Sequence, residues 1–238
     1  MDLKESALLG EQAARHWYYR AKAQAVSRCL GKLAPRYILD VGAGSGLFSR
    51  HLLGHGPARS AWCVDPNYPE DHDTTVAGKP LHFRRSAPAV QVDLVLMLDV
   101  LEHVEDDLAL LRTYVQHVAP GTFFLLSVPA FNWLWSAHDV FLEHHRRYTL
   151  RQLEDTVRHA GLQRLQGHYF FGAVLPLAAV LRLSERWRAH PERAPRSQLV
   201  PHARWTNQLL AWVCQAELPL MHLNRLGGLS AFCLARKP

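Results

Sequence analysis

The sequence predicts an α/β fold with a mostly parallel sheet, and three mainly apolar runs carry that prediction. The runs cover residues 37–41, 94–98 and 122–128, and the one at 94–98 is apolar throughout. Runs of this kind are typical of parallel strands buried on both faces, and helix-like patterns occur between and after them. With 238 residues, 48% of them hydrophobic, the chain can bury one substantial core, so we expect a single domain over residues 1–238.

A glycine-rich turn follows the first run. Gly42, Gly44 and Gly46 provide positions where the backbone can turn tightly or approach a ligand closely. With Asp40 before them they form the pattern DxGxGxG, whose spacing differs from the GxGxxG of dinucleotide-binding turns. The spacing therefore disfavours a nicotinamide oxidoreductase. An ordinary turn between a strand and a helix is the alternative.

The elements around this turn follow from composition and periodicity. Residues 11–30 contain no proline or glycine and predict a helix. A second strand is expected at 60–64 and a weak third strand at 81–83. A short helix is expected at 47–53, and residues 67–79 are expected to be irregular or a short helix.

An acidic residue closes the second expected strand. Asp65, followed by Pro66, comes about twenty positions after the glycine turn, the spacing at which an acidic side chain binds a ribose. Adjacent parallel strands bring their carboxyl ends together, so Asp65 is placed to accept hydrogen bonds from a ribose diol. A loop aspartate that caps the next segment is the alternative.

A second signal lies at residues 92–107, VDLVLMLDVLEHVEDD. Residues 94–98 read as a central strand, residues 99–103 as a loop, and Asp106 or Asp107 as the cap of a helix. That helix carries an apolar face and stops before Pro120.

The two signals together resemble the cofactor motifs of class I S-adenosylmethionine-dependent methyltransferases. The resemblance implies a Rossmann-like sheet of seven strands, mostly parallel with the last strand antiparallel, and S-adenosylmethionine as the methyl donor. It also implies an N-terminal helical cover at 1–33, a helical insertion at 170–227 and a last strand at 229–235. The cofactor contacts it implies are Asp40, Gly42, Ala43, Gly44, Gly46, Asp65, Pro66, Asp99, Val100, Leu101 and His103.

Two details concern the rest of the cofactor. The stretch HWYYR at 16–20 is similar to one in many bacterial methyltransferases of this type, which implies that Trp17 covers the cofactor and Arg20 reaches its methionine carboxylate. The alternative is that these aromatic residues pack on the sheet. The family often has an adenine-binding polar residue after the third strand, but Arg84, Arg85 and Ser86 stand there, so the adenine contact stays open.

The loop at 130–148 is where we expect the acceptor, because loops at the carboxyl ends of parallel strands build active sites. Its pattern resembles a signature of bacterial methyltransferases associated with surface-lipid or glycan pathways. His138 and His144 are candidates for the general base, with Asp139 orienting an imidazole. The expected acceptor contacts are Trp133, Trp135, Arg146, Arg147 and Tyr148, with ordinary ion pairs as the alternative role of the two arginines.

The last third of the chain contains a helix, a strand and an insertion. Thr149 and Gln152 have the spacing of a capping box, which predicts a helix to Gly161 and a sixth strand at 162–169. The insertion has two apolar segments, at 170–183 and 209–223, on either side of an arginine-rich linker. Such a segment suits an anionic membrane surface. The alternative is a cap packed on the sheet or on a second subunit, as in a dimer.

Composition indicates which partners and which location to expect for the protein. The net charge of +6 suits an anionic partner, but no nucleic-acid module or base-methylation motif is present, so we do not expect nucleic acid to be the partner. The four cysteines have no metal-like spacing and are expected to be reduced core residues, and we expect no metal. With no signal peptide or membrane-length run, we expect a cytoplasmic protein, with peripheral attachment to the inner membrane as an open alternative.

We therefore expect an S-adenosylmethionine-dependent methyltransferase acting on a small or lipid-linked acceptor, at oxygen. The alternatives are a nucleic-acid methyltransferase and a non-catalytic membrane- or partner-binding protein that keeps the fold.

Overall fold

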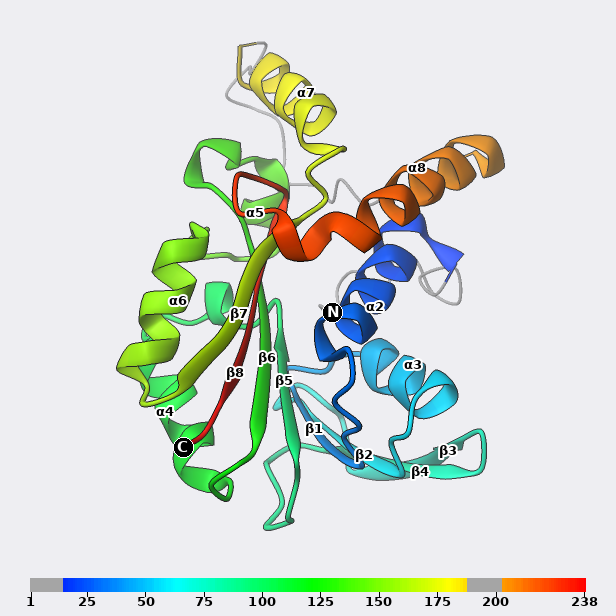
Figure 1. Cartoon of the computed structure of the whole chain (residues 1–238), viewed down its shortest axis with the longest axis vertical. Coiled ribbons are helices and arrows are strands. Elements are labelled where there is room, and N and C mark those ends of the chain that lie inside the picture. Colours follow the sequence, from blue (N-terminus) through cyan, green and yellow to red (C-terminus); the bar gives the residue numbers. More distant parts are fainter. Residues whose placement is uncertain (1–14, 188–202) are drawn as a thin grey trace.

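The central element is an eight-stranded sheet with helices on both faces (Figure 1). The computed structural model describes residues 15–187 and 203–238. Its strand order is β3-β4-β2-β1-β5-β6-β8-β7. The strands are β1 (Tyr37–Val41), β2 (Ser60–Val64), β3 (His72–Val76), β4 (Lys79–Arg84), β5 (Leu94–Leu98), β6 (Phe123–Pro129), β7 (Gln163–Phe170) and β8 (Ser230–Arg236).

Strand direction confirms the expected mixed sheet. Strands β1, β2, β4, β5 and β6 run parallel, so their carboxyl ends meet at one edge. The last strand, β8, lies antiparallel between β6 and β7, as expected. The first, second and central strands have the predicted bounds, and the other predicted strands differ from their predicted bounds by one or two residues at each end.

The sheet has one strand more than the seven expected, because residues 72–76 form strand β3, whereas residues 67–71 are irregular, as expected. Strand β3 pairs antiparallel with β4 through a two-residue turn at Ala77 and Gly78, whose φ angles are 51° and 75°. Positive φ at both turn positions matches the right-handed twist of a hairpin, and the β-branched Thr74, Thr75 and Val76 favour a strand. The sequence did not predict this edge hairpin because its first strand is polar and shows little apolar pattern.

The helices cover both faces of the sheet, and the apolar strands contribute side chains to the core on each face. Leu94, Leu96 and Leu98 of β5 pack in one core cluster, whereas Val95 and Met97 pack in the other. This explains why the central strand is apolar throughout rather than alternating. The helices are α2 (Trp17–Leu30), α3 (Leu47–His55), η2 (Leu101–His103), α4 (Asp107–His117), η3 (Asn132–Leu134), α5 (Ala137–Phe141), α6 (Leu150–His159), α7 (Leu175–Trp187), α8 (Arg204–Glu217) and η4 (Leu218–Leu223).

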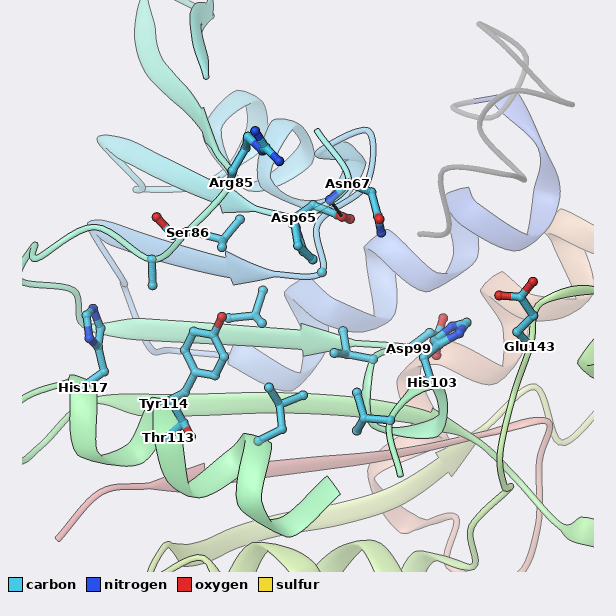
Figure 2. Close-up of a pocket in the computed structure, with 18 of the residues that line it drawn as sticks. Asp65, Asn67, Arg85, Ser86, Asp99, His103, Thr113, Tyr114, His117 and Glu143 are labelled. Atoms are coloured by element: carbon cyan, nitrogen blue, oxygen red, sulfur yellow. Dashed lines mark hydrogen bonds between the residues drawn. The ribbon is translucent and has the colours of Figure 1, made fainter. Parts of the chain in front are cut away.

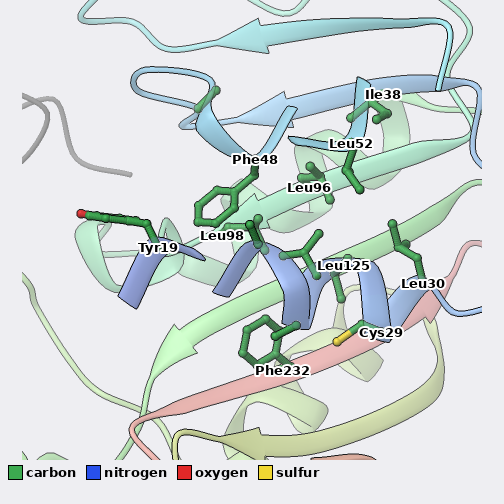
Figure 3. Packing of buried hydrophobic residues seen from close by; sticks show 14 of the residues in the cluster. Tyr19, Cys29, Leu30, Ile38, Phe48, Leu52, Leu96, Leu98, Leu125 and Phe232 are labelled. Carbon is green, nitrogen blue, oxygen red and sulfur yellow. The ribbon is translucent and has the colours of Figure 1, made fainter. Parts of the chain in front are cut away.

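The N-terminal helix α2 packs directly on the sheet. Figure 3 shows its Cys29 beside Leu125 and Phe232 of the strands, in the cluster that also includes residues of α3 and α8. The sequence predicts this helix from residue 11, but residues 11–14 lie outside the described residues. The same holds for residues 1–14 of the N-terminal cover expected at 1–33.

The helix ends confirm two predicted caps. The side chain of Asp106 accepts a hydrogen bond from the backbone N–H of Ala109 (2.8 Å), which starts α4. Thr149 and Gln152 form the predicted capping box at the start of α6. These caps place the loops that precede both helices at the carboxyl edge of the sheet.

The described part of the insertion contains α7, α8 and the short η4, and α7 and α8 extend beyond the sheet edge (Figure 1). Helix α8 packs on α2, and α7 has few neighbours. The linker arginines at 188, 193 and 196 lie outside the described residues. Among the described residues, no helix combines the length and apolar character needed to span a membrane. All four cysteines are free and buried, as expected.

Candidate functional site

A cavity of about 960 Å³ lies at the carboxyl ends of β1, β2, β4 and β5 (Figure 2). Its walls come from the segments that follow these strands, from helix α4 and from the residues after α5. The predicted cofactor residues that line it are Gly42, Asp65, Pro66, Asp99, Val100 and His103.

The glycine turn forms one wall of the cavity. Gly42, Gly44 and Gly46 have φ angles of 63°, 53° and 69°, which favour glycine. A Cβ atom on Gly42 would lie 2.7 Å from Cγ2 of Val100, so the turn and the segment after β5 pack too closely for any side chain there. Ala43 is buried beneath the turn and, like Gly44 and Gly46, supports the wall without lining it.

Asp40 holds the turn from below. Its buried carboxylate accepts a hydrogen bond from Oγ of Ser49 in α3 (2.7 Å), and burial raises its pKa to about 6. Asp40 does not line the cavity. The bond to Ser49 therefore joins the end of β1 to helix α3, on either side of the glycine turn.

Asp65 is the fixed carboxylate of the cavity. It is largely buried and accepts hydrogen bonds from the backbone N–H groups of Gly44 (3.3 Å) and Asn67 (3.0 Å). The hydroxyl of Tyr68 donates to the carbonyl of Gly44 (2.6 Å), which ties the two segments together. Each Asp65 oxygen keeps lone pairs for hydroxyl donors, as a vicinal diol requires.

The residue after β5 is held by a buried ion pair. Asp99 has a φ of 56°, and its carboxylate accepts a hydrogen bond from Ser127 (3.3 Å) and pairs with Nζ of Lys22. Lys22 comes from α2, and its side chain is fully buried. Burial alone would lower the pKa of Lys22, but the Asp99 carboxylate raises that pKa above its usual value, so the lysine stays charged.

The sequence reasoning missed Lys22. A signal was present, because Lys22, Val26 and Cys29 have helical spacing and all lie on the buried side of α2. A lysine on an apolar helix face needs a partner.

The aromatic stretch of α2 packs on the protein. Trp17 is buried and contacts Phe171 edge to face, with ring centroids 5.9 Å apart, whereas Arg20 is exposed. Neither residue lines the cavity, nor does the fully buried Leu101. The geometry therefore matches the packing alternative for Trp17.

In the acceptor loop, Asp139 binds His144 rather than His138. The buried Asp139 lies 2.9 Å from Nδ1 of His144 and accepts two hydrogen bonds from Arg147, at 2.7 and 3.1 Å. Burial alone would raise the pKa of Asp139, but the bond to His144 and the charge of Arg147 hold it below its usual value. Because this carboxylate only accepts, the imidazole of His144 donates from Nδ1, and in its neutral form it would carry its lone pair on Nε2.

The other predicted loop residues have structural partners. Burial lowers the pKa of His138 to about 4. Arg147 also donates to the carbonyl of Ala130 (3.0 Å), and Arg146 pairs with Asp107 (3.4 Å). The two arginines therefore form the ion pairs that were their alternative role. The hydroxyl of Tyr148 donates to Asp107 (2.7 Å), Trp133 is exposed and stacks on Phe131, and Trp135 is half-buried.

None of the eight predicted catalytic and acceptor residues lines the cavity, although their neighbours do. Glu143 and His145, on either side of His144, belong to the wall. Arg85 and Ser86, which stand where the adenine contact stayed open, also line the cavity. The other lining residues were not predicted as contacts: Val41, Val64, Asn67, Ala87, Val104, Leu110, Thr113, Tyr114, His117, Leu142, Glu143 and His145. Those on α4 have the spacing of one helix face, which is a signal that the sequence contains.

The chemistry of the walls suits an adenosine group with a charged tail. Val64, Val100 and Leu110 offer apolar surface for a planar ring, and Asp65 offers acceptors for ribose hydroxyls. The glycine turn offers backbone at a point where no side chain fits. The residues present therefore fit S-adenosylmethionine.

Comparison with known proteins agrees with this fit. A family model described as a methyltransferase domain matches residues 14–166. The comparison with curated proteins gives no match.

Three solved structures with the same fold illustrate the likeness. An S-adenosylmethionine-dependent methyltransferase of Archaeoglobus fulgidus is 15% identical, with a TM-score of 0.53 over 99% of this chain and 98% of that chain. A chain from the complex of the Haloferax volcanii Trm112 methyltransferase activator with a methyltransferase is 16% identical, with a TM-score of 0.56 over 95% and 91%. Phosphoethanolamine N-methyltransferase 2 of Haemonchus contortus, in complex with S-adenosylmethionine, is 14% identical, with a TM-score of 0.52 over 100% and 60%.

The family match covers more than half of the chain, and the sheet, the glycine turn and the cavity walls agree with it. The chain therefore belongs to the methyltransferase domain family and is a class I, S-adenosylmethionine-dependent methyltransferase in fold and cofactor.

Proposed function

We propose that this protein transfers a methyl group from S-adenosylmethionine to an oxygen of a small-molecule or lipid-linked acceptor. The observation that carries the proposal is the His144 imidazole, which Asp139 orients through Nδ1 beside the cavity. The ring of His103, a wall residue, lies 4.7 Å from the ring of His144, between centroids. A fixed imidazole with its lone pair on Nε2 supports proton removal from a hydroxyl at this end of the cavity.

The protein aligns the acceptor and removes its proton. Bound S-adenosylmethionine supplies an electrophilic methyl group on its sulfonium sulfur. Nε2 of His144 would take the proton of the acceptor hydroxyl as that oxygen takes the methyl group, and the electron pair of the broken bond would stay with the sulfur. A positioned base contributes about 10²- to 10⁴-fold to the rate of such a step.

The cofactor contacts in this proposal divide into two groups. Asp65 accepts hydrogen bonds from the ribose, and Gly42 and Asp99 face the charged tail, as cavity residues. Residues behind the wall hold these groups in place: Asp40, Ala43, Gly44, Gly46 and Leu101. We also propose that residues 1–33 cover the site and that residues 170–227 form a cap.

Exposed apolar stripes on the cap support a lipid-linked acceptor. On α8, Trp205, Leu209 and Trp212 are 72%, 56% and 68% exposed, whereas Ala211 and Cys214 on the other side are buried. On α7, three exposed apolar residues also share one face: Leu177, Val180 and Leu181. Apolar stripes of this kind suit the headgroup region of a bilayer. We propose peripheral attachment to the cytoplasmic side of an anionic membrane, with contact to a second subunit as the alternative.

The experiment that tests the proposed function uses purified protein, methyl-labelled S-adenosylmethionine and fractionated cell lipids and metabolites. We expect the label to enter one lipid or metabolite fraction. The His144→Ala variant should then lose about 10²-fold or more in rate with unchanged cofactor affinity, while His138→Ala, the matched control, keeps most of its rate. Label in the nucleic-acid fraction alone, or full turnover by His144→Ala, would contradict the proposal.

A further inference from the structure

Three side chains that commonly bind metals converge at the acceptor end of the cavity. Glu102 and His103 belong to η2, and His144 follows α5. One donor atom of each residue lies within 4.8 Å of the donor atoms of the other two. His103 also lines the cavity, so the cluster connects directly with the site of methyl transfer.

The buried carboxyl group of Glu102 has no hydrogen-bond partner in the described part of the chain that would explain its position, and a bound cation would supply a partner. Its side chain is fully buried, and neither carboxylate oxygen has a hydrogen-bond partner among the described residues. A buried carboxylate without partners is costly, and buried charges in proteins are paired or bind metals.

Asp139 supports the ring of His144 in the way that carboxylates support metal-binding histidines. Nδ1 contacts Asp139, which leaves Nε2 as the free donor atom. Asp139 is fixed in turn by the guanidinium of Arg147 and by the backbone N–H of Ser136 (2.9 Å). A carboxylate behind the far ring nitrogen is the usual support of a histidine ligand, because it fixes the ring and makes the ligand nitrogen more basic.

We propose that Glu102, His103 and His144 bind one divalent transition-metal ion of the zinc type. Two imidazoles and one carboxylate form a donor set that suits Zn²⁺ or Co²⁺ better than Mg²⁺, which prefers oxygen donors. Bonds of about 2.0 to 2.1 Å require tetrahedral donors about 3.4 Å apart, so the side chains must close by about an ångström on binding. This proposal replaces the expectation, from cysteine spacing alone, that the protein has no metal.

The role of the ion rests on the proposed function, whereas its binding does not. Three protein ligands leave a coordination position open, as in catalytic zinc sites. An acceptor hydroxyl at that position loses its proton to solvent more readily, because the cation stabilises the oxygen's negative charge. The oxygen would then take the methyl group as the carbon–sulfur bond breaks. Nε2 of His144 is the proton acceptor of the metal-free protein, whereas in the metal-loaded protein it is a ligand and the proton goes to solvent.

The test measures metal binding separately from catalysis. Untagged protein is stripped with a chelator and titrated with Co²⁺, with its visible absorption as the readout, and with Zn²⁺ in a calorimeter. We expect one ion per chain, an affinity that falls more than about tenfold in Glu102→Gln, and a loss of about 10- to 100-fold in Asp139→Asn. His138→Ala is the matched control and should bind like the wild type.

Thermal unfolding controls for misfolding. Without metal, Glu102→Gln should be at least as stable as the wild type, because the buried carboxyl group has no hydrogen bond with a described residue that it could lose, and Zn²⁺ should raise the melting temperature of the wild type only. S-adenosylmethionine affinity is measured in parallel, so a failure of the cofactor site is seen separately. Equal Co²⁺ affinity in wild type and Glu102→Gln, or no binding by a wild type that binds S-adenosylmethionine, would overturn the metal site.

Discussion

Lys22 of α2 and Asp99 at the end of β5 form an ion pair that joins the N-terminal helix to the wall of the cofactor cavity. The pair links two residues 77 positions apart in the chain. Burial alone would raise the pKa of Asp99, but Lys22 holds that pKa below its usual value. The N-terminal helix is therefore part of the cofactor site through Lys22.

Replacing Lys22 by methionine should destabilise the protein by about 2 to 3 kcal/mol, because removal of one partner leaves the other charge uncompensated. Affinity for S-adenosylmethionine should fall with it, since Asp99 loses its fixed position. Urea unfolding and calorimetry measure the two effects. Arg20→Ala is the control on the same helix, since Arg20 is exposed, and should change stability by less than about 0.5 kcal/mol. Equal stability of the two variants would contradict the role of Lys22.

Gly42→Ala should weaken S-adenosylmethionine binding about tenfold or more, because the added Cβ meets Val100 at 2.7 Å and displaces the cavity wall. Gly78→Ala is the matched control. Gly78 also has a positive φ, 75°, but a Cβ there meets nothing within 4 Å. Both variants carry backbone strain, and only Gly42→Ala should lose cofactor affinity in a calorimetric titration. Similar losses in both variants would mean that general destabilisation, not the wall contact, sets the affinity.

His168 should make stability depend on pH. Burial, with the charges of His222 and Arg225, lowers its pKa to about 4 in the folded protein, against 6.5 as the ordinary value. The folded state therefore disfavours protonation, and the stabilisation present above pH 6.5 is lost as the pH falls toward 4. The full loss amounts to about 3 kcal/mol.

Urea unfolding at pH 7 and at pH 4.5 measures this effect. His168→Gln should lose less stability between these values than the wild type, because glutamine does not titrate. Equal pH dependence of the two proteins would assign the loss to other groups.

Trp205→Glu with Trp212→Glu should reduce binding to anionic vesicles at least about fivefold, because the exposed stripe of α8 loses its apolar character. Vesicle flotation with and without anionic lipid measures the change. Leu165→Glu is the control, since Leu165 is an exposed apolar residue on β7, away from α8. Unchanged flotation combined with a change of molar mass in light scattering would favour a second subunit as the partner of this surface.

The sequence predicted what depends on local pattern. The run at 94–98 is apolar because it faces two core clusters, and the three glycines have positive φ angles because the turn needs them. Each of these properties belongs to a few neighbouring residues, so periodicity and spacing expose it. The edge hairpin was missed because its polar strand has one exposed face and little apolar pattern.

What the sequence did not predict depends on residues far apart in the chain. Lys22 and Asp99 meet only once α2 packs on the sheet, and Glu102 meets His144 only once the acceptor loop folds back. Arg147 was predicted to contact the acceptor, but in the structure its partner is Asp139. Spacing along the chain does not encode such pairs.

The measurement that tests the central claim most directly is calorimetric titration of the wild type and Asp65→Ala with S-adenosylmethionine and with NADH. Asp65 is the carboxylate proposed to hold the ribose. The account predicts one S-adenosylmethionine site per chain in the wild type, binding that is weaker by about 1 to 3 kcal/mol in Asp65→Ala, and no binding of NADH. Tight binding of NADH, or S-adenosylmethionine binding that is unchanged in Asp65→Ala, would contradict it.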